Sequence, residues 1–402
     1  MRNLNLKKKK LSIILIGALA IAVGLAGCTS FTNFITSFQD QGAGETTVRI
    51  GVFEPLSGED AKFGELEKRG VELANELYPK VLDKPVELII EDNKSNSDYA
   101  LVAAKDLIKK RASVILGSYG SSNSMIGGVE FEKAKIPAIA ITCSNPLVTS
   151  INNYYFRVSF IDTFQGIIMA KYAVNDSHAK KAAIITEDGN DFSSTMGTVF
   201  SDKFIALTGD KSAIVSVTKY SKDDNDYSVQ INAIKVATPD VIFIPGNPKE
   251  SAHFIKQAKE AGINAQFLGI NTIEDPNFIK IAGDAAEGVV FSTLYDPKVI
   301  LNEKTTEFLN AFHKKYGNDV VPTREEVLGF DSYLVAIDAI SRAGSAVKGD
   351  KVKEALVLTQ QLKGANGDIT FDQNKDAVKP VVMKTIQNGE FIFKSIIAPS
   401  WG

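Results

Sequence analysis

The chain has 402 residues with 45 Lys or Arg and 48 Asp or Glu, which gives a formal net charge of −3 at pH 7. It has two cysteines and shows no basic patch interleaved with aromatic residues, so it resembles neither a nucleic-acid-binding protein nor a disulfide-stabilised small domain. A chain of this length buries roughly three quarters of its unfolded surface, usually in more than one domain.

The first 27 residues are typical of an export signal. Five of the first ten residues are basic, and an apolar segment follows from Leu11 to Ala26. This segment is shorter than the ~20 residues that a membrane-spanning helix requires. It ends in Leu25-Ala26-Gly27-Cys28, which resembles the lipobox of bacterial lipoproteins, where cleavage precedes the cysteine and the cysteine carries lipid. We therefore expect lipid attachment at Cys28; the alternative is an ordinary signal peptide with a chance cysteine.

If Cys28 carries lipid, the protein is anchored to the extracytoplasmic face of the bacterial cell membrane. The following residues, 28–47, are polar with scattered Phe and predict a tether between the lipid and the fold. Cys143 then has no cysteine left to pair with.

From Val48 onward, short β-branched runs alternate with helical patterns. Near-continuous apolar runs of this kind are typical of strands buried on both faces of a parallel sheet. We predict strands at 48–53, 86–91, 112–117 and 136–141, then at 182–186, 213–217, 241–245, 266–269 and 288–292. The helices expected between them include 63–77, 99–110, 193–207 and 249–261.

The last hundred residues change the order. Three helical patterns follow one another at 305–316, 332–344 and 352–359, and strand-like runs return at 368–371, 381–386 and 391–397. This order predicts an α/β fold with two doubly wound parallel-sheet lobes, each completed by a segment from the far end of the chain and joined by several crossovers. We predict an N-terminal lobe of 48–162 plus 296–372 and a C-terminal lobe of 163–295 plus 373–402.

Two Gly/Ser-rich loops follow predicted strands of the first lobe. One is 118–124 in ILGSYGSSNS, and the other is Thr142-Cys143-Ser144-Asn145-Pro146. Ligands of open α/β sheets bind beyond the carboxyl ends of the strands, and free N–H groups at a helix start favour an anion. The loops carry no Lys or Arg, so a carboxylate held by uncharged hydroxyl and amide donors fits better than a phosphate. The alternative is a turn followed by a helix cap.

Catalysis has little support in the sequence. Ser121 lacks the Gly-x-Ser-x-Gly elbow of a nucleophile. His178, His253 and His313 are most simply surface or packing residues. We predict no catalytic residue, cofactor or metal.

The segments together resemble one family. They are Ile50-Gly51-Val52 with Pro55-Leu56-Ser57-Gly58, Phe63-Gly64, Gly70, 117–124, Ile136-Pro137, Ser144-Asn145-Pro146, Asn190-Asp191-Phe192-Ser193, 281–288 and Gly329-Phe330-Asp331-Ser332-Tyr333. In order and spacing this set is similar to the branched-chain amino acid binding proteins of ABC importers, the type I periplasmic binding protein fold.

The resemblance implies the ligand contacts of both lobes. The Ser121 hydroxyl would contact the ligand carboxylate, with Ser122 as a further ligand-binding residue beside it. Ser144 would contact both the carboxylate and the ammonium, and the Thr142 carbonyl would accept from the ammonium. The aromatic positions are Phe63 and Phe192, which would close over the ligand from opposite lobes, while Asn247 stands where the family is often aromatic. Ser332 would be structural, at a helix start.

Asn271 departs from the family pattern, because the family has an acidic residue there that pairs with the ligand ammonium. An amide can accept a hydrogen bond but loses the charge-assisted part, about 1–2 kcal/mol. Either Glu274 or Asp275 reaches in instead, or the ligand is an amide, a small acid or an aromatic compound. The alternative for Glu274-Asp275-Pro276 is the acidic start of a helix.

The expected function is therefore that of an extracytoplasmic substrate-binding lipoprotein, a monomer that passes a small solute to an ABC permease and its ATPase. A sensory ligand-binding module and a surface-anchored hydrolase are the rival classes. Hinge closure of one lobe on a ligand docked to the other would be the working motion.

Overall fold

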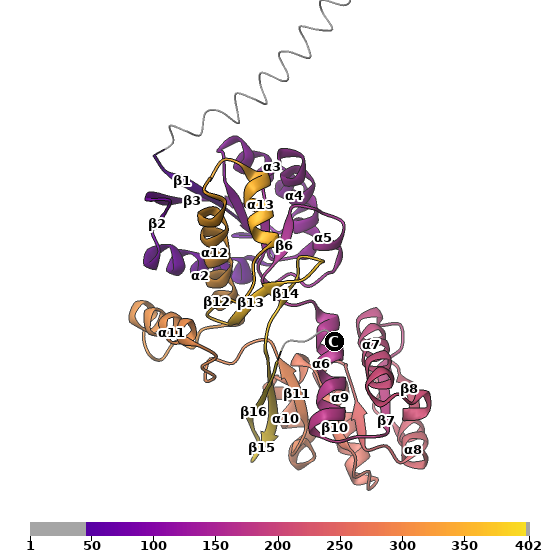
Figure 1. Cartoon of the computed structure of the whole chain (residues 1–402). Helices are drawn as coiled ribbons and strands as arrows, with labels where there is room; N and C mark the ends of the chain where they lie inside the picture. The colour runs from indigo at the N-terminus through magenta and orange to yellow at the C-terminus, as the bar shows by residue number, and fades with distance from the viewer. Residues whose placement is uncertain (1–45, 399–402) are drawn as a thin grey trace, which may run out of the picture.

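The computed structural model describes residues 46–398, so the predicted signal peptide, the lipid attachment at Cys28 and most of the predicted tether lie outside it. Two lobes follow one another along the long axis of the molecule (Figure 1), each built on its own sheet. This confirms the predicted α/β fold with two sheet-centred lobes. No helix within residues 46–398 is long and apolar enough to cross a membrane.

The upper lobe is built on a six-stranded sheet with the order β2-β3-β1-β4-β5-β6. All neighbours pair in parallel except β2 and β3. Its strands are β1 (Val48–Glu54), β2 (Lys80–Val81), β3 (Lys84–Asp92), β4 (Val114–Gly117), β5 (Ala138–Ala140) and β6 (Tyr155–Arg157).

Helices cover both faces of this sheet because alternate side chains of its strands are apolar on each side. Ile50 and Val52 of β1 pack in the cluster with α2 and α12, whereas Phe53 packs with α3 and α4. The helices of this lobe are α2 (Ala61–Leu77), α3 (Ser97–Lys109), α4 (Ser121–Ala134), α5 (Leu147–Ser150), α11 (Glu303–Tyr316), α12 (Arg324–Ala343) and α13 (Gly349–Val357).

The lower lobe has a seven-stranded sheet with the order β16-β15-β11-β10-β9-β7-β8, in which the last two strands of the chain pair antiparallel at one edge. Its strands are β7 (Ala182–Glu187), β8 (Ile214–Tyr220), β9 (Val241–Phe243), β10 (Gln266–Gly269), β11 (Val290–Thr293), β15 (Val381–Gln387) and β16 (Glu390–Ile397). Its helices are α6 (Asp162–Lys171), α7 (Asp191–Thr208), α8 (Ser228–Ala237), α9 (Pro248–Glu260) and α10 (Pro276–Ala282).

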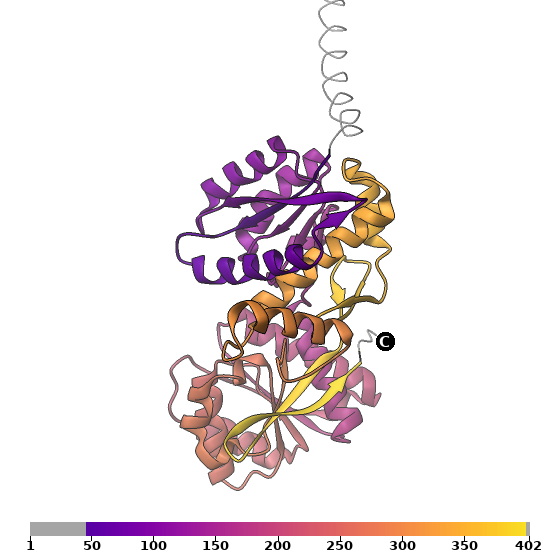
Figure 2. The same ribbon diagram turned by 90° about the vertical axis from the view of Figure 1, so that its left-hand side faces the viewer.

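The chain passes between the lobes three times, from β6 to α6, from β11 to α11 and from β14 to β15. A small sheet of β12 (Leu362–Gly364), β13 (Gly367–Phe371) and β14 (Ala377–Val378) lies beside the third passage (Figures 1 and 2). We propose these passages as the lobe boundaries; the third falls after the position at 372/373 predicted from the sequence.

One predicted helix start is wrong. Ser332 lies inside α12, which begins at Arg324 behind a capping box formed by Thr323 and Glu326. The first turn of the helix buries Glu325 and Glu326, although both are acidic. The sequence therefore shows a regular pattern of apolar residues only after Asp331. Ser332 is nevertheless structural, since its hydroxyl donates to the Gly329 carbonyl at 2.7 Å.

Candidate ligand-binding site

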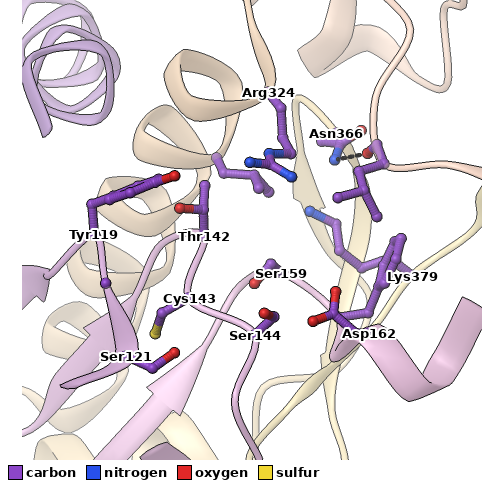
Figure 3. A pocket seen from close by; sticks show the side chains of 14 residues that line it. Tyr119, Ser121, Thr142, Cys143, Ser144, Ser159, Asp162, Arg324, Asn366 and Lys379 are labelled. Atoms are coloured by element: carbon purple, nitrogen blue, oxygen red, sulfur yellow. Dashed lines mark hydrogen bonds between the residues drawn. The ribbon is translucent and has the colours of Figure 1, made fainter. Parts of the chain in front are cut away.

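Three neighbouring strands of the upper lobe end at one pocket. β4, β5 and β6 are adjacent and parallel, so the loops that follow them open at the same edge of the sheet. Residues of all three loops line a cavity of about 210 Å³ (Figure 3). Other lining residues come from the passages between the lobes and from the start of α12. This is the strand-end position at which open α/β sheets bind ligands.

The pocket gathers hydroxyl groups. Ser121, Thr142 and Ser144 line it as the sequence predicted, and Ser159 joins them from the loop after β6. Ser121 is the first residue of α4 and follows Gly120, whose φ of 88° favours glycine. The Ser159 hydroxyl is buried and has no hydrogen-bond partner in the described part of the chain, residues 46–398. An unpartnered buried hydroxyl in a pocket is available to a ligand.

Positive groups also reach the pocket. Arg324, the first residue of α12, holds its guanidinium there through a 2.7 Å bond from its Nη2 to Glu325 Oε1. Lys379 lines the pocket from the third passage, and its Nζ pairs with the buried Asp331 at 3.0 Å. The pocket therefore contains cationic side chains besides the uncharged donors expected from the sequence, and each of the two is paired with a carboxylate. Which of these groups holds the ligand stays a prediction. The positive ends of α4 and α12 at this pocket favour an anionic group.

The same pocket contains one acidic side chain that the sequence did not single out. Asp162 opens α6 and lines the pocket near Lys379 (Figure 3). It carries a carboxylate for a cationic group of a ligand, opposite in sign to Arg324. Cys143 also lines the pocket, but burial raises the pKa of its thiol, which disfavours the thiolate needed by a nucleophile. None of the lining residues is a histidine.

Phe63 does not line the pocket itself. Its ring stacks on that of Tyr119, which does, with centroids 4.7 Å apart and planes at 9°. Ser122 is exposed on the first turn of α4 and does not line the pocket. The contacts predicted for these two residues remain predictions.

The predicted residues of the lower lobe do not line this pocket. Phe192 is exposed at the start of α7, and Asn247 is exposed after β9. The Asn247 amide donates to Glu187 Oε2 at 3.0 Å, and Asn190, the cap of α7, donates to the same oxygen at 3.0 Å. Glu187 ends β7, so the lower lobe presents a carboxylate at its own strand ends.

Asn271 is held in a fixed orientation. Its backbone N–H donates to Gln165 Oε1 at 3.1 Å, and Ser292 Oγ donates to the same oxygen at 3.0 Å. The other amide atom of Gln165, Nε2, therefore donates to Asn271 Oδ1 at 2.9 Å. Because this bond uses one of the two acceptor positions of the amide oxygen, Asn271 can still offer its NH₂ donor and one neutral acceptor position.

Glu274 and Asp275 make hydrogen bonds within the lower lobe. Asp275 caps α10 by accepting from the Asn277 backbone N–H at 2.8 Å, as the helix-start alternative predicts. Glu274 accepts from Thr293 at 2.6 Å and from Lys384 at 2.5 Å. Neither residue lines the pocket.

Sequence reasoning missed the residues that come from the passages and from α12. Ser159 and Asp162 could have been found, because they follow the strand next to two strands whose loops were singled out. Arg324 and Lys379 carry no such signal. Both follow the three strand-end loops by more than 150 residues in the sequence, so only the folded structure shows that they line the same pocket.

Two sheet-centred lobes, three passages between them and a polar pocket at the strand ends define a two-lobed solute-binding protein. The chain belongs to the periplasmic binding protein family, whose model matches residues 47–390.

Three similar proteins illustrate the family. The leucine-, isoleucine-, valine-, threonine- and alanine-binding protein of Pseudomonas aeruginosa is 24% identical over 348 residues, covering 85% of this chain and 90% of the relative. The structure of a leucine-binding protein of Thermotoga maritima is 34% identical with a TM-score of 0.66, covering 88% of this chain and 99% of that one. A branched-chain amino acid transporter substrate-binding protein of Streptococcus pneumoniae, solved with isoleucine, is 25% identical with a TM-score of 0.64, covering 88% and 100%.

Proposed function

We propose that this chain is the extracytoplasmic substrate-binding lipoprotein of an ABC importer, which holds a small carboxylate-bearing solute between its lobes and delivers it to a permease. The observation that carries the proposal is the pocket itself. Hydroxyls from three strand-end loops, the starts of α4 and α12, and the Arg324 guanidinium converge on a space suited to one carboxylate.

Amino acids, branched-chain ones first, are the ligand class that the similar proteins support. In this chain two carboxylates of the lower lobe are candidates for the ammonium: Asp162, which lines the pocket, and Glu187, which ends β7. Either could receive the ammonium of a zwitterion after the lobes close. Lipid at Cys28 would keep the protein at the membrane, next to the permease.

One observation favours a second ligand class, small acids without an ammonium group. Asn271 offers a neutral amide, with a donor and one remaining acceptor position, where an ammonium group would gain more from a carboxylate. Arg324 lines the pocket of the upper lobe with a guanidinium. A 2-oxo acid or another neutral-tailed carboxylate satisfies both residues, whereas an amino acid leaves its ammonium to Asp162 or Glu187.

A thermal-shift screen, followed by calorimetry, tests the proposal. The set contains leucine, isoleucine, valine, their 2-oxo acids, leucinamide and benzoate. We expect binding to require a carboxylate, so leucinamide should not bind. Stabilisation by none of the carboxylates, or equal stabilisation by leucinamide and leucine, would contradict the proposal.

Serine variants test the assigned contacts. Ser121→Ala and Ser159→Ala should each weaken binding by about 10-fold or more, because a hydrogen bond to a charged group contributes about 1.5–3 kcal/mol. Ser159→Ala should leave the unfolding temperature unchanged, since the Ser159 hydroxyl has no hydrogen-bond partner among residues 46–398. Ser150→Ala, at an exposed position of the same lobe, is the matched control and should bind normally.

A further inference from the structure

Two buried glutamates lie together beneath the pocket. Glu54 ends β1 and Glu67 lies in α2, and both side chains are completely buried. Within residues 46–398 neither carboxyl forms an ion pair, although their side chains are within hydrogen-bonding reach of each other. Two carboxylates buried side by side cannot both be ionised at an acceptable cost.

Two of the four carboxyl oxygens accept a hydrogen bond, and the other two do not. Glu54 Oε2 accepts the Tyr119 backbone N–H at 2.7 Å, and Glu67 Oε1 accepts the Thr142 hydroxyl. Glu54 Oε1 and Glu67 Oε2 have no hydrogen-bond partner among the described residues 46–398. One proton placed between these two oxygens supplies a donor for one and leaves an acceptor on the other, so both are satisfied.

The backbone around the pair leaves room for it. A Cβ on Gly117 would overlap Glu54 Oε1, and Gly117 has a φ of 112°, so a side chain is disfavoured there on both counts. Glycine at the end of β4 therefore admits the Glu54 carboxyl into the space behind the pocket.

The charges that face the pair do not neutralise it. Burial first, and repulsion by Glu67 second, raise the pKa of Glu54 well above its usual value. Burial raises the pKa of Glu67 to about 7, against the hydrogen bonds from Glu54 and Thr142. The other titratable or charged groups facing the pair are Arg324 and Glu325 of α12, Cys143 after β5, Tyr119 after β4 and Tyr155 of β6.

The two satisfied oxygens connect the pair to the ligand pocket. Tyr119 and Thr142 both line the pocket and belong to the loops after β4 and β5. Each loop is thus tied from behind to one member of the pair. The distance between the loops depends on whether the two carboxyls attract or repel each other.

We propose that Glu54 and Glu67 share a proton and act as positioning residues, holding the Tyr119 and Thr142 loops at the spacing that ligand binding requires. Loss of the shared proton at alkaline pH sets two buried negative charges against each other, spreads the loops and weakens binding. The part that concerns ligand rests on the proposed function, whereas the part that concerns the loops does not.

Two substitutions at Glu67 distinguish the effect of the shared proton from the effect of side-chain packing. In Glu67→Gln the amide Nε2 donates to Glu54 Oε1 and the amide oxygen accepts from Thr142, so the shared hydrogen is made permanent. Glu67→Leu fills similar space and makes neither bond. Glu250→Gln removes a buried carboxyl of α9 in the other lobe and is the matched control.

Hydrogen–deuterium exchange of the full chain between pH 6 and pH 9 provides a readout without ligand. Relative to intrinsic exchange rates, peptides covering 118–124 and 142–148 should lose about 10-fold or more protection in Glu67→Leu at every pH, as expected for buried polar groups left unpaired. Wild-type protection should fall with rising pH, whereas Glu67→Gln should stay constant. The Glu250→Gln profile should follow that of the wild type.

Two results would overturn the proposal. One is that the loop peptides of Glu67→Leu are as protected from exchange as those of the wild type. The other is that protection changes with pH in the same way in the wild type and in Glu67→Gln across the whole range. The binding arm uses L-leucine and calorimetry over the same pH values, with the dissociation constant of the wild type expected to rise with pH and that of Glu67→Gln to stay constant. If leucine binds to no form at any pH, leucine is rejected as the ligand, and the exchange profiles still decide on the pair.

Discussion

At the scale of single residues, we expect Asn271 to influence which ligands the lower lobe accepts. Gln165 Nε2 uses one of the two acceptor positions on its amide oxygen and leaves its NH₂ group and the other acceptor position. An ammonium group has only donors, so it can gain at most a neutral hydrogen bond from this oxygen. The residue should therefore hold an ammonium group more weakly than a carboxylate would.

Asn271→Asp is expected to raise the affinity for leucine by about 10-fold, because a charge-assisted hydrogen bond contributes about 1.5–3 kcal/mol and part of it offsets desolvation. Gln165 can donate to one oxygen of the new carboxylate while the other faces the ligand. The affinity for the 2-oxo acid should fall, because two negative charges then approach each other. Calorimetry with both ligands measures the two changes.

Asn277→Asp is the control for this prediction. Asn277 is exposed in the first turn of α10, so the substitution adds the same charge to the same lobe away from the cleft. If both variants change the affinity equally, the effect is long-range electrostatics. If neither changes it, Asn271 does not face the ligand ammonium.

At the scale of elements, the contact between α2 and α12 sets the position of the Arg324 end of the pocket. The helices cross so closely that a Cβ on Gly70 would overlap the Glu326 carbonyl oxygen, and one on Gly329 would overlap the Glu67 carbonyl oxygen. The same crossing places Glu67 against Glu54 and starts α12 beside the pocket. Two glycines thus allow one helix contact to support both the buried pair and the guanidinium.

Gly70→Ala should lower the free energy of unfolding by at least about 2 kcal/mol, because overpacking costs about 1–3 kcal/mol and the overlap is with backbone rather than a movable side chain. Gly209→Ala is the comparison. Gly209 ends α7 with a φ of 69° and open space around it, so that substitution should cost only the left-handed strain of about 1 kcal/mol. Urea unfolding measures both, and equal losses would show that the helix contact can relax.

The elements that could be predicted from sequence are those whose signal is local. Buried strands such as β1 and β7 show as apolar runs, and the Gly/Ser loops after β4 and β5 follow from their strands. The start of α12 was hidden because its first turn buries Glu325 and Glu326, which the sequence presents as exposed. The Glu54–Glu67 pair and the Arg324 contact depend on how α2 and α12 dock, and no short segment contains that information.

At the scale of the whole molecule, buried ion pairs fasten the passages between the lobes. Arg157 Nε pairs with Asp376 at 3.0 Å, and Lys379 pairs with Asp331 at 3.0 Å. Lys384 of β15 pairs with Asp296 of the second passage at 3.0 Å. Because breaking a buried pair is costly, we expect the lobes to move as units about these passages rather than by rearranging them.

The split of the candidate ligand contacts between the lobes predicts closure. The carboxylate pocket belongs to the upper lobe and the passages, while Phe192, Asn247 and Asn271 stand outside it on the lower lobe. A ligand docked in the pocket gains these contacts only if the lower lobe moves toward it. A ligand shifts such an equilibrium by the difference between its affinities for the two forms, so the closed form should dominate only when ligand is present.

Small-angle X-ray scattering should therefore show a smaller radius of gyration when the best ligand of the screen is added at 100 times its dissociation constant. The same concentration should stabilise the protein against unfolding by about 2.7 kcal/mol, which confirms occupancy independently of shape. In a Phe192→Ala, Asn247→Ala double variant the ligand can still dock on the upper lobe, so binding should weaken and the compaction at saturation should shrink. Identical scattering with and without saturating ligand would show that the lobes do not close, and that the upper-lobe pocket binds its ligand alone.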